Sequence, residues 1–343
     1  MFPFVRPLLS VFIWVHLWLI DLVAAKGPRR ENQAKYWCRV TTTENIETVF
    51  EEQRPVLFGL AYRMLGSVAD AEDVVQESYL RWQAADRGDV QSPKAFLVTV
   101  ATRLALDQLR RRKRERETYV GPWLPEPLLT DDSADECAEM AESLSLAFLT
   151  LLEKLQPVER AVFLLHEVFQ YSHDDIAAMV EKSRENCRQI LMRAKQHLAA
   201  GRPRFRPEPA QQQALLGQFL ETCRSGDVAA LARLLVDDAV MVSDGGGKAQ
   251  AARKIVRGAA MVARALVGLA KKKAVGFETR FATVNGVYSL LMCGPGFVDT
   301  LVNFEFTSDG RVAAVHIVRN PDKLTHLPVP EVPRAPARPV SGN

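Results

Sequence analysis

The sequence predicts a multi-domain chain in which two all-α domains, the second with a helix-turn-helix, precede an α+β domain. Apolar residues recur at helical spacing in successive segments between residues 45 and 198. Two of these segments, short and separated by the polar residues Glu181-Lys182-Ser183, have the pattern of a helix-turn-helix. Beyond residue 207, helical patterns give way to alternating strands, in which Asn285-Gly286 and Asp309-Gly310 are typical hairpin turns.

Length and composition are those of a globular protein with room for two or three domains. The chain has 343 residues, of which 25% are charged and 48% are hydrophobic. Its formal net charge of +3 is too small to indicate a nucleic-acid partner by itself. The five cysteines, at positions 38, 137, 187, 223 and 293, lack both disulfide-framework and zinc-ligand spacing. This pattern favours a reducing compartment, so we expect a cytoplasmic protein without a bound metal or cofactor.

Residues 1–42 form an apolar extension that conflicts with a cytoplasmic location. Leu8–Ile20 is an almost continuous apolar run, preceded by Arg6 and followed by Val23-Ala24-Ala25. This arrangement is typical of a signal peptide or a short membrane anchor. The alternative is that translation starts near Thr41, in which case we expect residues 1–40 to be dispensable for activity.

The first all-α domain is expected to contain three helices. Asn45–Leu65 and Ala69–Trp82 have helical apolar spacing, and in the second of them the acids and the apolar residues fall on different faces. A loop follows at Ala84–Gln91. Ser92 then caps the third helix, and Pro93 occupies its first position.

The third helix ends in a dense basic run, Arg110–Arg116, which has two interpretations. The helix dipole stabilises cations at a helix C-terminus, so a solvated helix end is the first interpretation. Six cations within seven residues exceed what such capping needs. A surface that contacts the phosphate groups of a nucleic acid is therefore the better interpretation.

A linker separates the two all-α domains. It contains Trp123-Leu124-Pro125-Glu126-Pro127, in which two prolines exclude a regular helix. An exposed Trp123 in such a segment would be unfavourable, so we expect this side chain to dock against another part of the chain. The stretch from Asp131 to Glu142 holds six acids and no cation, a composition typical of disorder.

The second all-α domain is expected to begin with a helical pair, Leu144–Leu155 and Pro157–Phe169. In the helix-turn-helix that follows, Ser172 with Asp175 resembles a capping box, and Ser183 caps the second helix. The apolar stripe of that second helix leaves side chains that bond base edges and phosphates on its other side; the stripe comprises Cys187, Ile190, Leu191, Ala194 and Leu198.

The alternative for this stretch is a plain helical hairpin with no role in DNA binding. The turn of a helix-turn-helix often has Gly where Glu181 stands in this sequence. A non-glycine residue with a left-handed backbone at this position costs roughly 1 kcal/mol.

Taken in order, these segments resemble a bacterial extracytoplasmic-function sigma factor over residues 45–198. The segments that carry the resemblance are DAEDVVQESYLRW from Asp70, SPKAFLVTVATRLALDQLRRRKRE from Ser92, the linker and the terminal helix-turn-helix. The resemblance implies two partners, core RNA polymerase and promoter DNA. The basic helix and the loop before it suit the physical demands of promoter melting, which needs cations along a single strand and a pocket for an unstacked base.

The resemblance also implies site residues for each partner. Those facing the core polymerase are Asp70, Glu72, Asp73, Gln76 and Glu77. Those opening and reading the −10 element lie in the segment Asp86–Arg116, and comprise Lys94, Arg103, Asp107, Arg110, Arg111, Arg112 and Lys113. Those reading the −35 element in the major groove are Ser183, Arg184, Asn186, Arg188, Gln189, Arg193 and Lys195.

The remainder of the chain is expected to be an α+β domain. Helical patterns at Gln212–Cys223, Val228–Leu235 and Ile255–Leu269 precede the strands, with one short strand at Val240–Val242. The alternation from Phe277 to Thr283 then begins an antiparallel sheet. This order of elements resembles the SnoaL-like cone fold, the family of ketosteroid isomerase.

Three short motifs resemble those of the sigma-J-like group, in which a SnoaL-like domain follows the sigma domains. They are WLPEP in the linker, DGGGK at residues 244–248 and NPDKL at residues 320–324. The DGGGK motif lacks the spacing of a Walker phosphate loop, so a flexible surface loop or a protein contact is favoured. NPDKL has one acid, too few for a metal site, and a docking motif is favoured.

The hypothesis is that the three motifs dock on one another and regulate the spacing of the sigma domains. The resemblance implies a built-in regulator, so that no separate anti-sigma factor is required, and leaves room for an unidentified small ligand in the C-terminal domain. The regulatory residues are expected to be Trp123, Leu124, Pro125, Asp244, Gly245, Gly246, Gly247, Lys248, Asn320, Pro321, Asp322 and Lys323.

Two alternatives to a regulated sigma factor stay open. The cone fold can support an enzyme, for which the candidate carboxylates are Asp244, Glu278, Asp299 and Glu305, but no catalytic pairing is readable and we expect none. A membrane-tethered regulator would rest only on residues 8–20. The expected boundaries are 1–42 for the extension, 43–117 and 144–201 for the sigma domains, 118–143 for the linker, 207–325 for the SnoaL-like domain and 326–343 for a Pro-rich disordered tail.

Overall fold

A computed structural model describes residues 33–85, 90, 92–130, 143–199, 209–271 and 276–330 of the chain. The apolar run at residues 8–20, the acidic stretch at 131–142 and most of the tail lie outside the described residues, as does the side chain of Lys113. In the part that the structure describes, no helix is long and apolar enough to cross a membrane. The chain divides into two units, Met1–Gln53 and Arg54–Asn343, and every site discussed below lies in the second.

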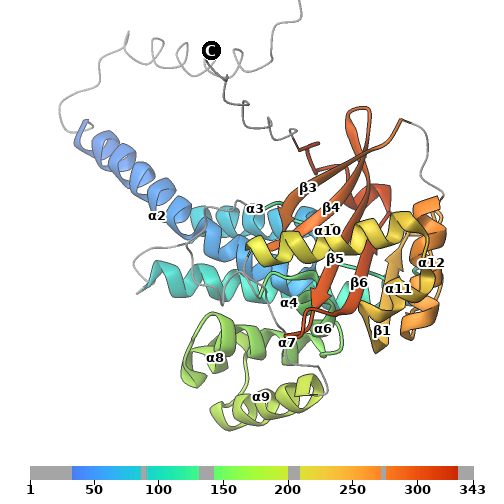
Figure 1. The fold of residues 1–343 in the computed structure, drawn as a ribbon. Helices are drawn as coiled ribbons and strands as arrows, with labels where there is room; N and C mark the ends of the chain where they lie inside the picture. The colour runs from blue at the N-terminus through green and yellow to red at the C-terminus, as the bar shows by residue number, and fades with distance from the viewer. Residues whose placement is uncertain are drawn as a thin grey trace, which may run out of the picture. The chain divides into compact units, whose positions relative to one another are not determined.

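The first helical domain contains the three helices that the sequence predicted (Figure 1): α2 (Gln33–Leu65), α3 (Val68–Ala84) and α4 (Pro93–Glu117). Helix α2 begins at Gln33, twelve residues before the expected Asn45. Gly66 ends it with a left-handed φ of 67°, a conformation that glycine adopts without strain. The hydroxyl of Ser92 accepts a hydrogen bond of 3.3 Å from the amide of Ala95, which confirms the predicted cap of α4.

The second helical domain comprises α6 (Leu146–Leu152), α7 (Pro157–Phe163), the π-helical turn η2 (Leu164–Val168), α8 (His173–Val180) and α9 (Arg184–Ala199). Both predicted caps of the helix-turn-helix are confirmed. Ser172 accepts from the amide of Asp175 at 3.2 Å, and Ser183 accepts from the amide of Asn186 at 3.2 Å. The apolar stripe of α9 is buried from Cys187 to Ala194, so the other side of this helix faces solvent.

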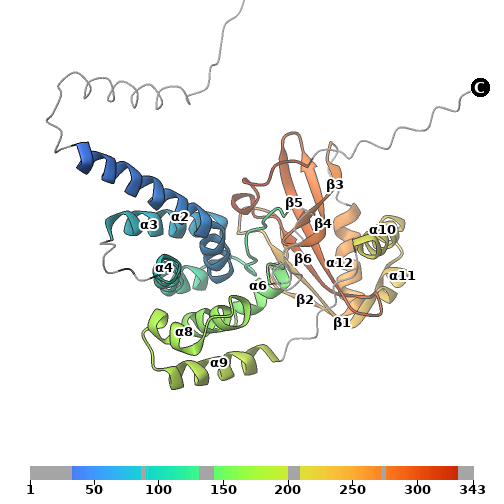
Figure 2. The same ribbon diagram turned by 90° about the vertical axis from the view of Figure 1, so that its left-hand side faces the viewer.

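The C-terminal domain packs three helices on one face of a six-stranded sheet (Figures 1 and 2). Its elements are α10 (Pro209–Ser225), α11 (Val228–Arg233), β1 (Leu235–Asp244), β2 (Val256–Arg257), α12 (Ala259–Lys271), β3 (Glu278–Val284), β4 (Val287–Gly294), β5 (Phe297–Phe306), β6 (Val312–Val318) and the 3-10 turn η3 (Pro321–Lys323). The strand order is β2-β1-β6-β5-β4-β3, antiparallel except for the parallel pair β1 and β6.

Three expectations for this domain were wrong in their boundaries. Strand β1 has ten residues rather than three, and it begins at Leu235, where a helix was expected to end. Helix α12 begins at Ala259 rather than Ile255, because Val256 and Arg257 pair with β1 as a short strand. All three follow from the pairing of β1, which lies between β2 and β6, and its longer partner β6 is distant in sequence.

The other face of the sheet is covered by the linker and by the start of helix α6. Leu124 and Leu146 are completely buried in a cluster with residues of β1, β4, β5 and β6. The linker also extends the sheet at its β3 edge, where Thr130 donates from its amide to the carbonyl of Thr283 at 3.0 Å. The linker is therefore part of the core of the C-terminal domain.

Candidate nucleic-acid interface and linker junction

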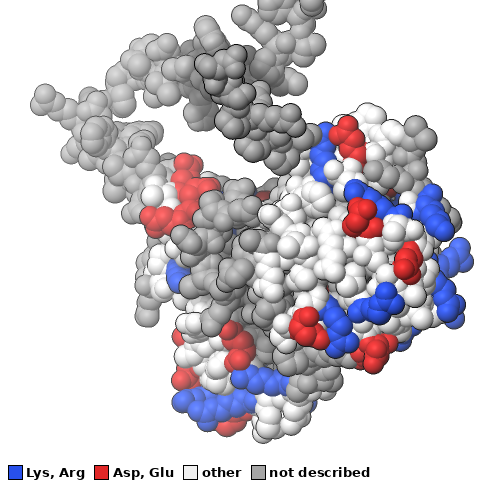
Figure 3. Space-filling model, viewed as in Figure 1, with Lys and Arg blue, Asp and Glu red and all other residues white. Residues whose placement is uncertain are grey.

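Helix α9 presents the residues expected to read the −35 element on its exposed side. Arg184, Arg188, Gln189, Arg193 and Lys195 are exposed, as is Ser183, and Asn186 is half-buried. Two of the cations are paired within the domain, Arg184 with Asp174 at 3.4 Å and Lys195 with Glu167 at 2.9 Å. Figure 3 shows Lys and Arg side chains on the α8–α9 region at the bottom of the view, with acidic side chains among them.

The turn between α8 and α9 contains the left-handed residue that the sequence indicated. Glu181 has φ 56° and ψ 50°, and the amides of Glu181 and Lys182 both donate to the carbonyl of Ala177. This is the conformation that favours glycine, and a side chain here costs roughly 1 kcal/mol. The helix-turn-helix geometry is therefore retained despite an unfavourable residue at its turn.

Helix α4 places the residues expected to contact the −10 element in two different surroundings. Lys94, Asp107, Arg110 and Arg111 are exposed, and Arg110 pairs with Asp107 at 2.9 Å. Arg103 instead reaches α8, and Arg112 pairs with Asp70. The positively charged face of this helix is thus available to a partner only in part.

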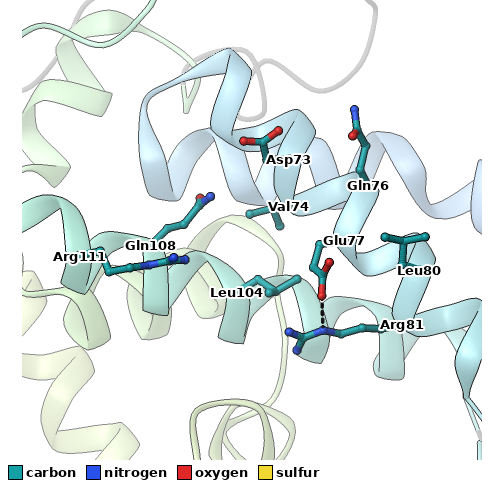
Figure 4. Close-up of a pocket in the computed structure, with 9 residues that line it drawn as sticks. All are labelled: Asp73, Val74, Gln76, Glu77, Leu80, Arg81, Leu104, Gln108 and Arg111. Atoms are coloured by element: carbon teal, nitrogen blue, oxygen red, sulfur yellow. Dashed lines mark hydrogen bonds and ion pairs between the residues drawn. The ribbon is translucent and has the colours of Figure 1, made fainter.

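The acidic face of α3 lies beside α4 and contributes to a surface pocket (Figure 4). The pocket has a volume of about 440 Å³, and its lining includes Asp73, Gln76 and Glu77 together with Leu80 and Arg111. An ion pair of 2.9 Å joins Glu77 to Arg81 at its rim. Three of the expected polymerase-facing residues therefore share one concave surface.

Two other residues expected to face the polymerase point elsewhere. Asp70 is mostly buried, and burial raises the pKa of its carboxyl despite the opposing effect of Arg112. Glu72 pairs with Arg54 at 3.0 Å. The expectation that Asp70 lies on the exposed acidic face was wrong, because its side chain is buried and pairs with Arg112 of α4.

The linker junction is centred on a buried ion pair between Asp244, at the end of β1, and Lys323, in η3. The Asp244 side chain is completely buried, and its Oδ2 lies 2.7 Å from Lys323 Nζ. The same oxygen accepts the amide of Leu124 at 2.8 Å, and Lys323 donates to the carbonyl of Leu124. Both members of the pair therefore bond the backbone of one linker residue.

Aromatic side chains complete the surroundings of Lys323. Its Nζ lies 4.2 Å from the ring centroid of Trp123 and 5.1 Å from that of Tyr119, within the range of cation–π attraction. The hydroxyl of Tyr119 donates to Asp244 Oδ1 at 2.6 Å. Burial and the Asp244 carboxylate raise the pKa of Tyr119, so its phenol stays protonated and keeps this hydrogen bond.

The DGGGK and NPDKL motifs meet beside this ion pair. Asn320 donates to the Tyr119 hydroxyl at 3.0 Å, and Lys248 pairs with Asp322 at the surface. Gly246 has φ 58°, and a Cβ at this position would lie 2.3 Å from the Asn320 amide. The three motifs therefore lie in contact, and DGGGK makes the protein contact that was one of its two interpretations.

The remaining regulatory candidates divide between the interior and the surface. Pro125 is buried with the linker, and Gly245 is also buried, where a Cβ would lie 2.4 Å from the carbonyl oxygen of Ala249. Gly247 and Pro321 are exposed. The four carboxylates considered for catalysis are dispersed: Asp244 pairs with Lys323, Glu278 with Arg280, Asp299 with Arg319, and Glu305 lies 3.5 Å from His316.

Sequence reasoning missed a second junction, centred on the side chain of Asn285. Its amide nitrogen donates to the hydroxyl of Tyr62 at 2.7 Å and to the carbonyl of Leu144 at 2.8 Å, and its oxygen accepts the amide of Leu128 at 2.9 Å. Asn285 is completely buried. The Asn-Gly pair did predict the hairpin turn, but no local signal indicated contacts with both helical domains and the linker.

Comparison with known proteins matches both helical domains to families. Residues 49–115 match Sigma-70 region 2, and residues 145–198 match Sigma-70 region 4. The ECF RNA polymerase sigma factor SigJ of Mycobacterium tuberculosis is 36% identical over 295 residues, which cover 82% of this chain and 94% of that protein. The probable ECF RNA polymerase sigma factor SigI of the same species is 33% identical over 194 residues, 55% of this chain and 67% of that protein.

Structural comparison extends the similarity through the C-terminal domain. The crystal structure of the M. tuberculosis extracytoplasmic function sigma factor SigJ aligns with a TM-score of 0.64 at 32% sequence identity. The alignment covers 80% of this chain and 97% of that chain. The C-terminal domain thus has a counterpart at the same place in a solved structure.

Proposed function

Because the chain belongs to the extracytoplasmic function (ECF) sigma factors of RNA polymerase, we propose that its linker junction regulates how the two sigma domains engage a promoter. Promoter-directed initiation of transcription follows from the family, and core polymerase and promoter DNA are its partners. The protein's proposed location is the cytoplasm, where the polymerase acts.

Three exposed surfaces of the sigma domains are assigned to the two partners. The pocket lined by Asp73, Gln76 and Glu77 faces the core polymerase, and the exposed cations of α4 follow the −10 strand. The exposed side of α9 enters the major groove at the −35 element. The observation that supports this last assignment is the separation of a buried apolar stripe from an exposed side rich in Arg and Gln, which bond guanine and adenine edges.

Replacing Arg188 or Arg193 with alanine is expected to weaken binding to the −35 element without unfolding the protein. Both side chains are exposed, and neither forms an ion pair with another residue that the structure describes. A lost base-edge contact should reduce affinity by roughly 1–3 kcal/mol, whereas a lost phosphate contact should mainly flatten the salt dependence. The measurement is fluorescence anisotropy on a cognate duplex, found by transcribing genomic fragments with core polymerase.

The matched control is Arg224→Ala, which removes an exposed arginine from α10 in the C-terminal domain. Its affinity should equal that of the unchanged protein. Equal affinity of all four proteins, with circular dichroism showing intact helices, would reject the assignment of α9 as the recognition helix.

The linker junction is proposed to set promoter output because it fixes the segment that joins the two sigma domains. The linker runs from α4 to α6, and Leu124 is held by both Asp244 and Lys323. Opening this contact would release the linker and change the reach of α9 relative to α4. The C-terminal domain would then act as a built-in regulator in place of a separate anti-sigma factor.

Removing the chain from Asn320 onward is expected to change promoter output several-fold, because Lys323 is lost and Asp244 is left without its cation. Trp123→Ala should also change output, and the double variant should not be additive, since coupled sites fail additivity. Run-off transcription from one cognate promoter compares the intact, truncated, Trp123→Ala and double-variant proteins. A chain ending at Pro330 keeps the whole junction and serves as the control.

Equal output from all these proteins would contradict a regulatory junction while leaving the sigma-factor assignment intact. The unidentified small ligand stays a prediction. Binding of such a ligand in the C-terminal domain would be seen as a change in the output of the intact protein that the truncated protein lacks.

A further inference from the structure

The first helix of the helix-turn-helix ends against α4 of the other sigma domain. Arg103 on α4 donates from Nε to the carbonyl of Met179 at 3.1 Å and from Nη2 to the carbonyl of Ala178 at 3.0 Å. These carbonyls belong to the last turn of α8, where a helix lacks its own amide donors. An arginine of one domain therefore caps a helix of the other.

Glu181 gives this contact a charged component. Its carboxylate lies 3.2 Å from Nη2 of Arg103, the nitrogen that also bonds Ala178. Glu181 is the left-handed turn residue, at a position where glycine would be free of strain. The turn does not need this carboxylate for its own geometry, since the backbone bonds to Ala177 close it. The carboxylate instead serves the contact with α4.

Arg103 belongs to the stripe of α4 that is expected to contact DNA. Arg103, Asp107 and Arg110 follow one another at spacings of four and three residues, and Arg111 lies four residues after Asp107, which places them along one side of the helix. The end of this stripe at Arg103 lies under α8. A nucleic-acid strand that follows the stripe from Arg111 toward Arg103 would meet the helix-turn-helix.

We propose that Arg103, Glu181 and the C-terminal turn of α8 form an interdomain catch that keeps the two DNA-binding surfaces of the free sigma factor folded against each other. With the catch closed, Arg103 is withheld from DNA and α9 is held close to α4. Opening it frees Arg103 and separates the domains. The catch lies apart from the linker junction, because none of its members contacts Asp244, Lys323 or Trp123 among the interactions of the described residues.

The exposure of the pair makes the catch reversible. The side chains of Arg103 and Glu181 are 46% and 73% exposed, so water and salt weaken their attraction. Such a contact can shift the equilibrium between the closed and the open arrangement a few-fold toward the closed one, but it cannot make the closed arrangement permanent. DNA or core polymerase, which bind the open arrangement, can therefore open the catch by mass action.

The decisive variant is Glu181→Gly, which removes the carboxylate and also relieves the left-handed strain. It should not unfold the protein, because glycine suits this turn. The matched control is Gln170→Gly, since Gln170 is another exposed residue of the same domain with a left-handed φ, 58°, but lies outside the contact with α4. Glu181→Gln provides a second variant that removes only the charge.

Two measurements on the full chain report the state of the catch. Small-angle scattering gives the radius of gyration, and fluorescence anisotropy gives the affinity for a short duplex of arbitrary sequence, whose phosphates bind without sequence preference. Glu181→Gly should increase both, with an affinity gain of about two- to fivefold, the range open to an exposed ion pair. Glu181→Gln should act in the same direction, and Gln170→Gly should change neither.

Three outcomes would overturn the catch. An unchanged radius of gyration and an unchanged affinity in Glu181→Gly would show that the carboxylate does not hold the two sigma domains together. Equal gains in Glu181→Gly and Gln170→Gly would assign the effect to backbone strain. Additive changes in radius on combining Glu181→Gly with Arg103→Ala would show that the two side chains act independently, whereas one catch requires the second change to add little.

Discussion

Asp244→Ala is expected to lower the free energy of unfolding by about 3–5 kcal/mol, because it leaves the Lys323 ammonium buried without its anion. The same change removes the acceptor of the Leu124 amide and of the Tyr119 hydroxyl, so the linker loses its anchor on β1. Urea-induced unfolding followed by circular dichroism measures the loss. Faster hydrogen exchange at the Leu124 amide would show that the loss of stability arises where the linker is anchored on β1.

A surface ion pair in the same motifs provides the control. Asp322→Ala removes the partner of Lys248, and both side chains are more than half exposed, so the expected loss is below about 1 kcal/mol. The double variant Asp244→Asn with Lys323→Met should lose less than the sum of the single losses, because neither charge is then left alone. Equal stability of Asp244→Ala and Asp322→Ala would contradict a buried anchoring role for Asp244.

Asn285→Gly should destabilise the protein by about 2–4 kcal/mol while leaving the hairpin turn intact. Glycine adopts the left-handed conformation that Asn285 has, so the loss comes from three buried hydrogen bonds, each contributing about 1 kcal/mol. The bonds join the C-terminal domain to Tyr62, Leu144 and Leu128. Proteolysis should therefore cut the linker faster in this variant, as well as shift the urea midpoint.

Two further variants test the origin of that loss. Asp309→Gly changes the residue before the glycine of the exposed turn between β5 and β6, and it should destabilise the protein far less than Asn285→Gly. Tyr62→Phe removes one hydroxyl from the Asn285 network, and combining it with Asn285→Gly should add little. Full additivity of Tyr62→Phe and Asn285→Gly would mean that the two residues stabilise the protein separately.

Features that depend on neighbours in sequence were predicted from the sequence alone. The caps at Ser92, Ser172 and Ser183 need only the next few residues, and so does the Asn285-Gly286 turn. The order of two helical sigma domains and an α+β SnoaL-like domain was also predicted, and it is confirmed. The regular spacing of apolar residues carries this information.

Features that depend on distant partners were not predictable in detail. The charge and exposed face of Arg103 follow from helical spacing, but its bonds to α8 do not. Asp244 was placed in a loop because its partners, at positions 119, 124 and 323, are separated from it by about eighty residues or more in either direction. Asn285 likewise showed its turn chemistry but not its three contacts.

The place of β6 in the sheet fixes an order of events during synthesis on the ribosome. This strand is the last one in the part of the chain that the structure describes, yet it lies between β1 and β5, so the sheet stays divided until residues 312–318 have emerged. Lys323, in η3, follows this strand and emerges later still. Both sigma domains therefore leave the ribosome complete while their linker still lacks its anchor. A truncated or nascent product carries the promoter-binding helices without the restraint that the finished protein imposes on them.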